Sequence, residues 1–164
     1  MSDELLAALN GFLGRASKST YAGGGGETDS WRKGFKELEY SEDGWYYRDS
    51  YTGYLRSWGQ EVVWHNDKPA WTCLYGGGMT EDHMDSVFAD KTFVFLKQVL
   101  SAGDKEIIFQ PRGPKKFSDG DWKYQCTFDG DISKFSGNES ISYKNEVIFT
   151  HEFFGGLVIA STSV

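Results

Sequence analysis

Hydrophobic residues recur at helical spacing in two stretches of the chain. In the first, residues 3–16, the apolar face consists of Leu5, Leu9, Phe12, Leu13 and Ala16. Acidic residues in its first turn suit the helix dipole. A second helix is predicted to begin after Thr80, a typical N-cap residue, and to end at Gly103. Its apolar positions are Met84, Val87, Phe88, Phe95, Leu96, Val99 and Leu100.

Short runs of aromatic and β-branched residues follow each predicted helix, and turn-forming residues separate these runs. The turn signals are Ser41-Glu42-Asp43-Gly44, Asn66-Asp67, Ser118-Asp119-Gly120 and Lys144-Asn145. Their spacing predicts hairpins, with about four antiparallel strands after each helix. The glycines at 23–26 indicate a loop.

The first and second halves of the chain also resemble each other. Trp45-Tyr46-Tyr47, Gly53, Gly59-Gln60-Glu61 and Gly77-Gly78 reappear as Trp122-Lys123-Tyr124, Gly130, Gly137-Asn138-Glu139 and Gly155-Gly156. The offset is 77 residues at Gly53 and 78 at Gly59, so one inserted residue explains the step. Such self-similarity predicts a tandem duplication.

Together these patterns predict an α+β fold in one domain, residues 1–164, built of two repeats, 1–79 and 80–164. Each repeat is expected to be a helix followed by about four antiparallel strands. The helices are expected to pack on the strands, which form either one continuous sheet or two facing sheets. At 164 residues the chain is long enough for one ordinary core and too short for two.

Composition narrows the expected partners and location. A net charge of -7 disfavours nucleic acid and anionic membranes, both of which attract basic patches. No apolar run approaches the length of a membrane span, and the start, Ser2-Asp3-Glu4, lacks a positive signal region. We therefore expect a cytoplasmic protein with no cofactor, in which Cys73 and Cys126 are free thiols.

Several short motifs resemble a bacterial family of uncharacterised domains. These are Tyr51-Thr52-Gly53, Trp58-Gly59-Gln60-Glu61-Val62-Val63, Lys68-Pro69-Ala70-Trp71, Tyr75-Gly76-Gly77, Arg112-Gly113-Pro114 and Phe154-Gly155-Gly156. The resemblance covers roughly residues 5–160. Members occur alone or behind an XRE-type helix-turn-helix, which implies a sensor or binding role and no established activity. The stretch before Leu5 is too short for a helix-turn-helix, so no DNA binding by this chain is implied.

Two glutamates at equivalent positions of the repeat are the main chemical signal. Glu139 shares strand parity with Gly137 and Ile141, and Glu61 shares it with Val63, so both carboxylates are expected on an inner face. A carboxylate there must find a partner or change its pKa. The pair could bind a cationic or polyhydroxylated ligand, or act as acid and base. The favoured interpretation is structural, with each Glu accepting hydrogen bonds that fix the strands.

Other chemistries are disfavoured. The glycines at 76–78 lead toward a helix and could cradle a phosphate, yet the repeated pair at 155–156 precedes a strand-like run, so a turn explains both. Cys126 and His151 could form a nucleophile and base, but no supporting motif exists. The three histidines, His65, His83 and His151, lack the spacing of metal ligands, so no metal site is expected.

The leading functional hypothesis is a non-enzymatic binding or sensor module with an aromatic, carboxylate-containing pocket for a small molecule between the two halves. The expected lining is Trp45, Tyr47, Trp58, Glu61, Tyr75, Trp122, Tyr124 and Glu139. Two alternatives stay open. One is a small hydrolase-like enzyme that uses Glu61 and Glu139. The other is a protein-interaction module that forms a homodimer through exposed aromatic residues.

Overall fold

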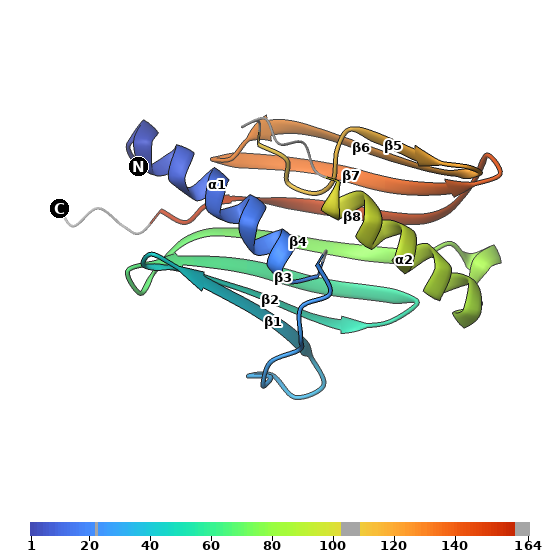
Figure 1. The fold of residues 1–164 in the computed structure, drawn as a ribbon, viewed down its shortest axis with the longest axis horizontal. Coiled ribbons are helices and arrows are strands. Elements are labelled where there is room, and N and C mark those ends of the chain that lie inside the picture. The colour runs from blue at the N-terminus through green and yellow to red at the C-terminus, as the bar shows by residue number, and fades with distance from the viewer. Residues whose placement is uncertain (22, 103–108, 160–164) are drawn as a thin grey trace.

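The computed structural model describes residues 1–21, 23–102 and 109–159 (Figure 1), a mixed α+β fold with two α-helices and one eight-stranded antiparallel sheet. The helices are α1 (Asp3–Ser19) and α2 (Ser86–Ser101), and a short 3-10 helix, η1 (Glu81–His83), precedes α2. The strands are β1 (Lys36–Glu42), β2 (Trp45–Gly53), β3 (Arg56–His65), β4 (Lys68–Met79), β5 (Lys116–Asp119), β6 (Trp122–Asp131), β7 (Lys134–Tyr143) and β8 (Glu146–Leu157).

Tight hairpins connect the strands where the sequence predicts them. Two-residue turns at Asp43-Gly44, Asn66-Asp67 and Lys144-Asn145 have positive φ at both positions, a conformation that suits Asn, Asp and Gly. Gly120, with φ of 57°, forms the corresponding turn between β5 and β6. All four predicted hairpin turns are therefore confirmed.

The two groups of four strands join at the centre of a single sheet. The strand order is β1-β2-β3-β4-β8-β7-β6-β5, so β4 and β8 are the central neighbours. In this central pair Tyr75 lies directly opposite Phe153, and these two residues are 78 positions apart, the offset of the sequence repeat. The sheet is thus continuous, and its order mirrors itself about the β4–β8 pair.

Figure 1 shows both helices on one side of the sheet, and each has an aromatic residue in contact with a tryptophan of the strands. On α1, Phe12 stacks on Trp45 with ring centroids 5.7 Å apart. On α2, Phe95 lies 5.4 Å from the ring of Trp122. The side chain of Ser2 accepts a hydrogen bond from the Leu5 backbone and starts α1, and the helix continues three residues beyond the predicted end at Ala16.

The predicted start of the second helix is wrong. Thr80 precedes only the 3-10 turn, because its hydroxyl bonds the His83 ring at 2.8 Å and caps no backbone N–H. The helix α2 begins at Ser86, and the Asp85 carboxylate caps it by accepting from Phe88 N at 2.8 Å. Gly103, the predicted end, lies outside the described residues.

The glycine runs lie inside strands, not in turns, which corrects the turn interpretation. Gly76, Gly77 and Gly78 belong to β4, and the pair at 155–156 belongs to β8. A Cβ on Gly78 would lie 2.1 Å from the Leu55 carbonyl oxygen, and its φ is 147°. Close backbone approach therefore requires glycine here, and the phosphate-cradle geometry is absent from this strand.

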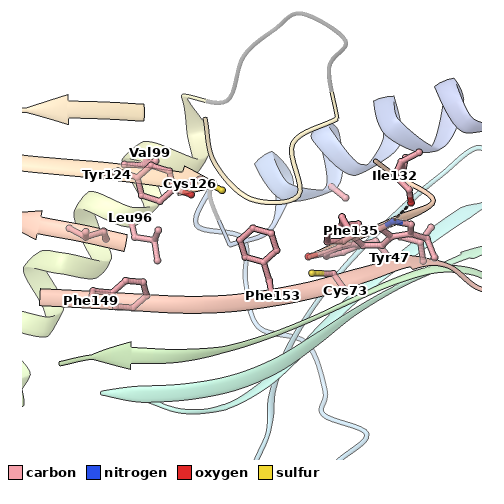
Figure 2. Close-up of a cluster of buried hydrophobic side chains, with 14 of the residues drawn as sticks. Tyr47, Cys73, Leu96, Val99, Tyr124, Cys126, Ile132, Phe135, Phe149 and Phe153 are labelled. Atoms are coloured by element: carbon pink, nitrogen blue, oxygen red, sulfur yellow. Dashed lines mark hydrogen bonds between the residues drawn. The ribbon is translucent and has the colours of Figure 1, made fainter. Parts of the chain in front are cut away.

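The hydrophobic core lies between the helices and the inner face of the sheet (Figure 2). Trp71 is almost fully buried at the sheet centre, and its indole N–H donates to the Ile132 carbonyl at 3.1 Å. Cys73 and Cys126 are buried and free, which confirms that neither forms a disulfide. Trp71 also stacks on Phe135, so the core crosses the β4–β8 junction.

Candidate functional site

Two rows of inward-facing residues cross the strands at matching places in the two groups. In one row Asp49, Glu61 and Cys73 are register neighbours on β2, β3 and β4. In the other row Glu139 lies between Cys126 and His151, on β7 between β6 and β8. The parity argument for the two glutamates is confirmed, because the side chain of Glu61 is 13% exposed and that of Glu139 is 0% exposed.

Arg112 joins the two glutamates. Its Nη1 lies 3.3 Å from Oε1 of Glu61, and its Nε donates to Oε1 of Glu139 at 3.0 Å. The segment after α2 that carries Arg112 is fixed on β6, since Gly113 N donates to the Tyr124 hydroxyl at 3.1 Å and Cys126 N donates to the Lys115 carbonyl. One buried guanidinium therefore serves a carboxylate from each group of strands.

Tyr75 links Asp49 to the cluster, because its hydroxyl donates to Oδ1 of Asp49 at 2.8 Å. The tyrosine ring can lie across β3 because Gly59 has no side chain, and a Cβ there would come within 2.4 Å of the ring. The Arg112 guanidinium lies 4.7 Å from the centroid of the same ring, and the electron-rich face of the ring attracts this cation. Tyr75 thus connects the carboxylate of Asp49 with Arg112.

Glu139 is ionised, and both of its carboxylate oxygens have hydrogen-bond partners. Burial by itself raises the pKa of this carboxyl, but Arg112 and hydrogen bonds from His151 and Tyr124 outweigh it and lower the pKa to about 2. Tyr124 donates to Oε2 at 2.6 Å, and the His151 Nδ1 lies 3.1 Å from Oε1. Every one of these contacts holds the strands together, as the structural interpretation of this residue predicts.

Glu61 behaves in the opposite way, although it occupies the equivalent position. Burial raises its pKa to about 8, with Arg112 opposing and the nearby Asp49 adding to the rise. Burial likewise raises the pKa of Asp49 to about 6, against the hydrogen bond from Tyr75. At neutral pH the cluster therefore holds ionised Glu139, mostly ionised Asp49 and largely protonated Glu61.

His151 presents an unpaired nitrogen. Burial lowers its pKa, and its contact with Glu139 opposes this shift, so the ring is neutral at physiological pH. Because ionised Glu139 can only accept, the Nδ1 of His151 carries the proton. The Nε2 can then only accept a hydrogen bond. Among the described residues it is the one buried side-chain nitrogen or oxygen atom that has no hydrogen-bond partner.

A cavity of about 730 Å³ lies over these groups, between the inner face of the sheet and the helices. Its walls are largely apolar, with Leu13 from α1 and Phe93 and Leu96 from α2. The polar residues on its floor are Tyr47, Asp49, Glu61, Tyr75, Arg112 and His151. An apolar cavity with a few convergent polar groups is the usual form of a small-molecule site.

The structure brings some of the predicted lining residues together and separates others. Tyr47, Glu61 and Tyr75 line the cavity. Glu139 is not part of the lining but bonds the cavity residues Arg112 and His151, and Tyr124 donates to Glu139. These five residues form one connected cluster with Arg112.

Three predicted residues lie elsewhere. Trp45 packs between Phe12 and His65 under α1, and Trp122 packs against α2. Trp58 is 57% exposed and has the opposite strand parity to Glu61, so its side chain lies on the other face of the sheet, over Gly76. None of these three lines the cavity.

Sequence reasoning did not include Asp49, Arg112 or His151 in the pocket. Asp49 shares parity with Tyr47 on β2, which was a usable signal. Arg112 lies between two prolines, Pro111 and Pro114, in a segment without periodicity, so its position could not be read from a pattern. The sequence suggested His151 as a base for Cys126 or as a metal ligand, and gave no reason to place it in the pocket.

The nucleophile and metal hypotheses gain no support from this geometry. Glu139 lies in register between Cys126 and His151 and takes the histidine N–H, and burial raises the pKa of Cys126 to about 11. Among the described residues there is no group of three or more His, Cys, Asp or Glu side chains that could hold a metal ion. Neither described helix is long and apolar enough to cross a membrane.

A family model described as a domain of unknown function, DUF5680, matches residues 49–158. The chain therefore belongs to this family of uncharacterised domains. The match begins at Asp49 and includes the cluster residues Glu61, Tyr75, Arg112, Tyr124, Glu139 and His151, while Tyr47 lies just before it. No curated protein and no solved structure matches the chain.

Proposed function

We propose that this protein is a non-enzymatic binding or sensor module that holds a small molecule in the cavity between the helices and the sheet. The observation that carries the proposal is the cavity of about 730 Å³ with the buried Arg112 cluster on its floor. We place the cavity between duplicated halves, since α1 and Glu61 come from the first repeat and α2 and Glu139 from the second. A cytoplasmic location and the association with XRE-type regulators belong to the same proposal.

The burial of so many polar groups supports a binding role. Tyr47, Asp49, Glu61 and His151 face a cavity that hydrophobic side chains of the same size could have filled, which stabilises a fold at least as well as a buried ion pair. Unfilled volume also costs stability, because its lining loses dispersion contacts. A ligand that fills the space and pairs with the polar floor would recover both.

A substitution at Gly14 tests the proposal without touching the polar floor. Gly14 lies in α1 and lines the cavity, and a Cβ added there would meet no atom within 4 Å. We expect Gly14→Phe to place a ring in the cavity and block binding. A metabolite library is screened by thermal shift, in which a ligand at 100 times its Kd adds about 2.7 kcal/mol to the stability of wild type.

Gly14→Ala is the control, because it also replaces the helix glycine, which is about 1 kcal/mol less favourable than alanine, and it leaves the cavity open. Compounds that raise the melting temperature of wild type and Gly14→Ala, and not that of Gly14→Phe, support binding in the cavity. Absence of any stabilising compound, or equal stabilisation of all three proteins, contradicts the proposal.

The geometry does not favour the hydrolase-like alternative, because Glu139 is not available as a second catalytic carboxylate. Both oxygens of Glu139 are engaged by Arg112, His151 and Tyr124, and Glu139 does not line the cavity. An acid–base pair needs both groups within reach of the substrate. The carboxyls that line the cavity are Asp49 and Glu61 instead, and their raised pKa values suit binding as well as proton transfer.

The homodimer alternative would use the other face of the sheet. Trp58, Leu74 and Phe154 are exposed there, and Leu74 and Phe154 are direct neighbours across β4 and β8. Light scattering over a range of protein concentrations tests this, with Trp58→Ser as the variant. A dimer that Trp58→Ser converts to a monomer would favour the interaction module.

A further inference from the structure

The polar floor of the cavity presents acceptors, while its hydroxyl and guanidinium donors already serve carboxylates. Tyr75 donates to Asp49, and Tyr47 donates to Glu61. Arg112 directs its Nε and Nη1 to the two glutamates. A carboxylate has about four lone-pair sites, so Asp49, and Glu61 once it has lost its proton, can each accept further hydrogen bonds.

His151 adds a third acceptor by an independent route. Its Nδ1–H is committed to Glu139, so Nε2 can only accept, and this buried atom has no protein hydrogen-bond partner among the described residues. A buried nitrogen without a hydrogen-bond partner destabilises the folded state. A ligand that donates a hydrogen bond to it would remove this destabilisation.

The charge of the carboxyl cluster also favours a ligand that donates hydrogen bonds. Three carboxyls lie around the guanidinium of Arg112: Glu61 and Glu139 pair with it directly, and Asp49 is linked to it through Tyr75. If all three were ionised, the cluster would carry two uncompensated negative charges in a site with little water, which is unfavourable. The protein avoids this by keeping a proton in the cluster, which a cation could replace.

We infer that the ligand of this cavity is an organic cation with an apolar body, whose ammonium group lies on the floor against Asp49, Glu61 and the Nε2 of His151. The inference rests on the proposed binding function and names its ligand class. An ammonium group supplies three donors and one positive charge, which matches three acceptors and an excess of carboxylates. Tyr47 and Tyr75 add aromatic faces beside the cation.

Charged groups also stand at the mouth of the cavity. α1 contributes Arg15 and Lys18, α2 contributes Asp90 and Lys97, and β1 contributes Lys36. All five are exposed, and Arg15 and Lys36 form ion pairs with glutamates outside the cavity. Solvent and salt screen these charges, so they act on the outer end of a ligand while the buried floor selects the inner group.

The inference predicts coupling between ligand and proton. Burial holds a proton on Glu61 up to about pH 8, and a bound ammonium group would release it. Affinity for a cation should therefore rise by up to roughly tenfold per pH unit as the pH approaches 8, and level off above that value. At pH 7 about one proton should leave for each cation bound.

Calorimetry with three matched probes tests this: 4-phenylbutylamine, 4-phenylbutanol and 4-phenylbutyrate, which share an apolar body and differ in the end group. We expect the amine to bind at least tenfold more tightly than the alcohol and the anion. Titrations in phosphate and in HEPES, which differ in ionisation enthalpy, measure the proton released. Glu61→Gln should abolish proton release, and Asp49→Asn should weaken amine binding at least tenfold.

Glu152→Gln serves as the control, because this exposed glutamate on β8 lies on the other face and should change nothing. Equal or tighter binding of the alcohol or the anion overturns the inference, as does amine binding without proton release. If no probe binds while the Gly14 variants still separate hits from the metabolite screen, the ligand class is wrong and the binding function stands. If that screen also fails, the binding function itself is wrong.

Discussion

At the scale of single residues, Glu61 and Glu139 show how equivalent positions acquire different chemistry. Each lies on an inner face next to Arg112. Glu139 has additional donors in His151 and Tyr124, whereas Glu61 has the carboxylate of Asp49 as its strand neighbour. Donors lower a carboxyl pKa and a nearby anion raises it, so one glutamate is fixed as a structural anion and the other titrates near neutrality.

The titration of Glu61 predicts how stability depends on pH. Its pKa is raised from 4.5 to about 8 in the folded state, so the folded protein holds this proton more tightly than the unfolded chain. The stabilisation is complete below about pH 4.5 and is lost as the pH rises toward 8. We expect the contribution of Glu61 to the free energy of unfolding to fall by up to about 1.4 kcal/mol per pH unit in that interval.

Urea unfolding at a series of pH values measures this dependence. Glu61→Gln, which keeps an oxygen for Arg112, should remove the decline between pH 6 and 8 while leaving the smaller one from Asp49, which ends near pH 6. Glu152→Gln should retain the wild-type slope. Parallel curves for wild type and Glu61→Gln would show that Glu61 does not hold the proton.

At the scale of elements, the glycines of β4 govern how the strand meets its neighbours. Gly78 has φ of 147°, and its backbone lies against the Leu55 carbonyl in the connection between β2 and β3. We expect Gly78→Ala to destabilise the protein by about 2–4 kcal/mol, because the methyl group would force the backbones apart and φ is strained. The urea midpoint measures the loss.

Gly26→Ala provides the comparison, since a Cβ there would meet nothing within 4 Å and its φ is not in the left-handed region. It should change stability by less than about 1 kcal/mol. Similar losses in the two variants would argue against close approach at Gly78 as the cause of its destabilisation.

The elements also show what could be predicted from sequence. The four hairpin turns were readable because positive φ restricts them to few residue types, and the glutamate faces were readable because strand parity is strict. The same parity rule would have separated Trp58 from Glu61, three positions apart on β3. Arg112 could not be found this way, since its place depends on a long-range contact of an irregular segment with β6.

At the scale of the whole molecule, interactions across the β4–β8 junction tie the two groups of strands into one unit. Trp71 stacks on Phe135 with centroids 5.6 Å apart and donates to the Ile132 carbonyl. Arg112 adds the ion pair with Glu61 from the opposite group. Neither group can keep these buried contacts when the other unfolds, which supports the proposal of a single domain made of two repeats.

One cooperative unfolding transition is therefore expected, and the distribution of tryptophan allows a direct test. Five of the six tryptophans precede residue 79, and Trp122 is the sixth, so indole fluorescence reports mainly on β1–β4 and their surroundings. Far-UV circular dichroism reports on both groups of strands. The two signals should give coincident urea midpoints, in wild type and in the destabilised Gly78→Ala alike. Separate midpoints would mean that β1–β4 and β5–β8 unfold independently. The cavity, which has residues from both groups, would then open when the first group unfolds.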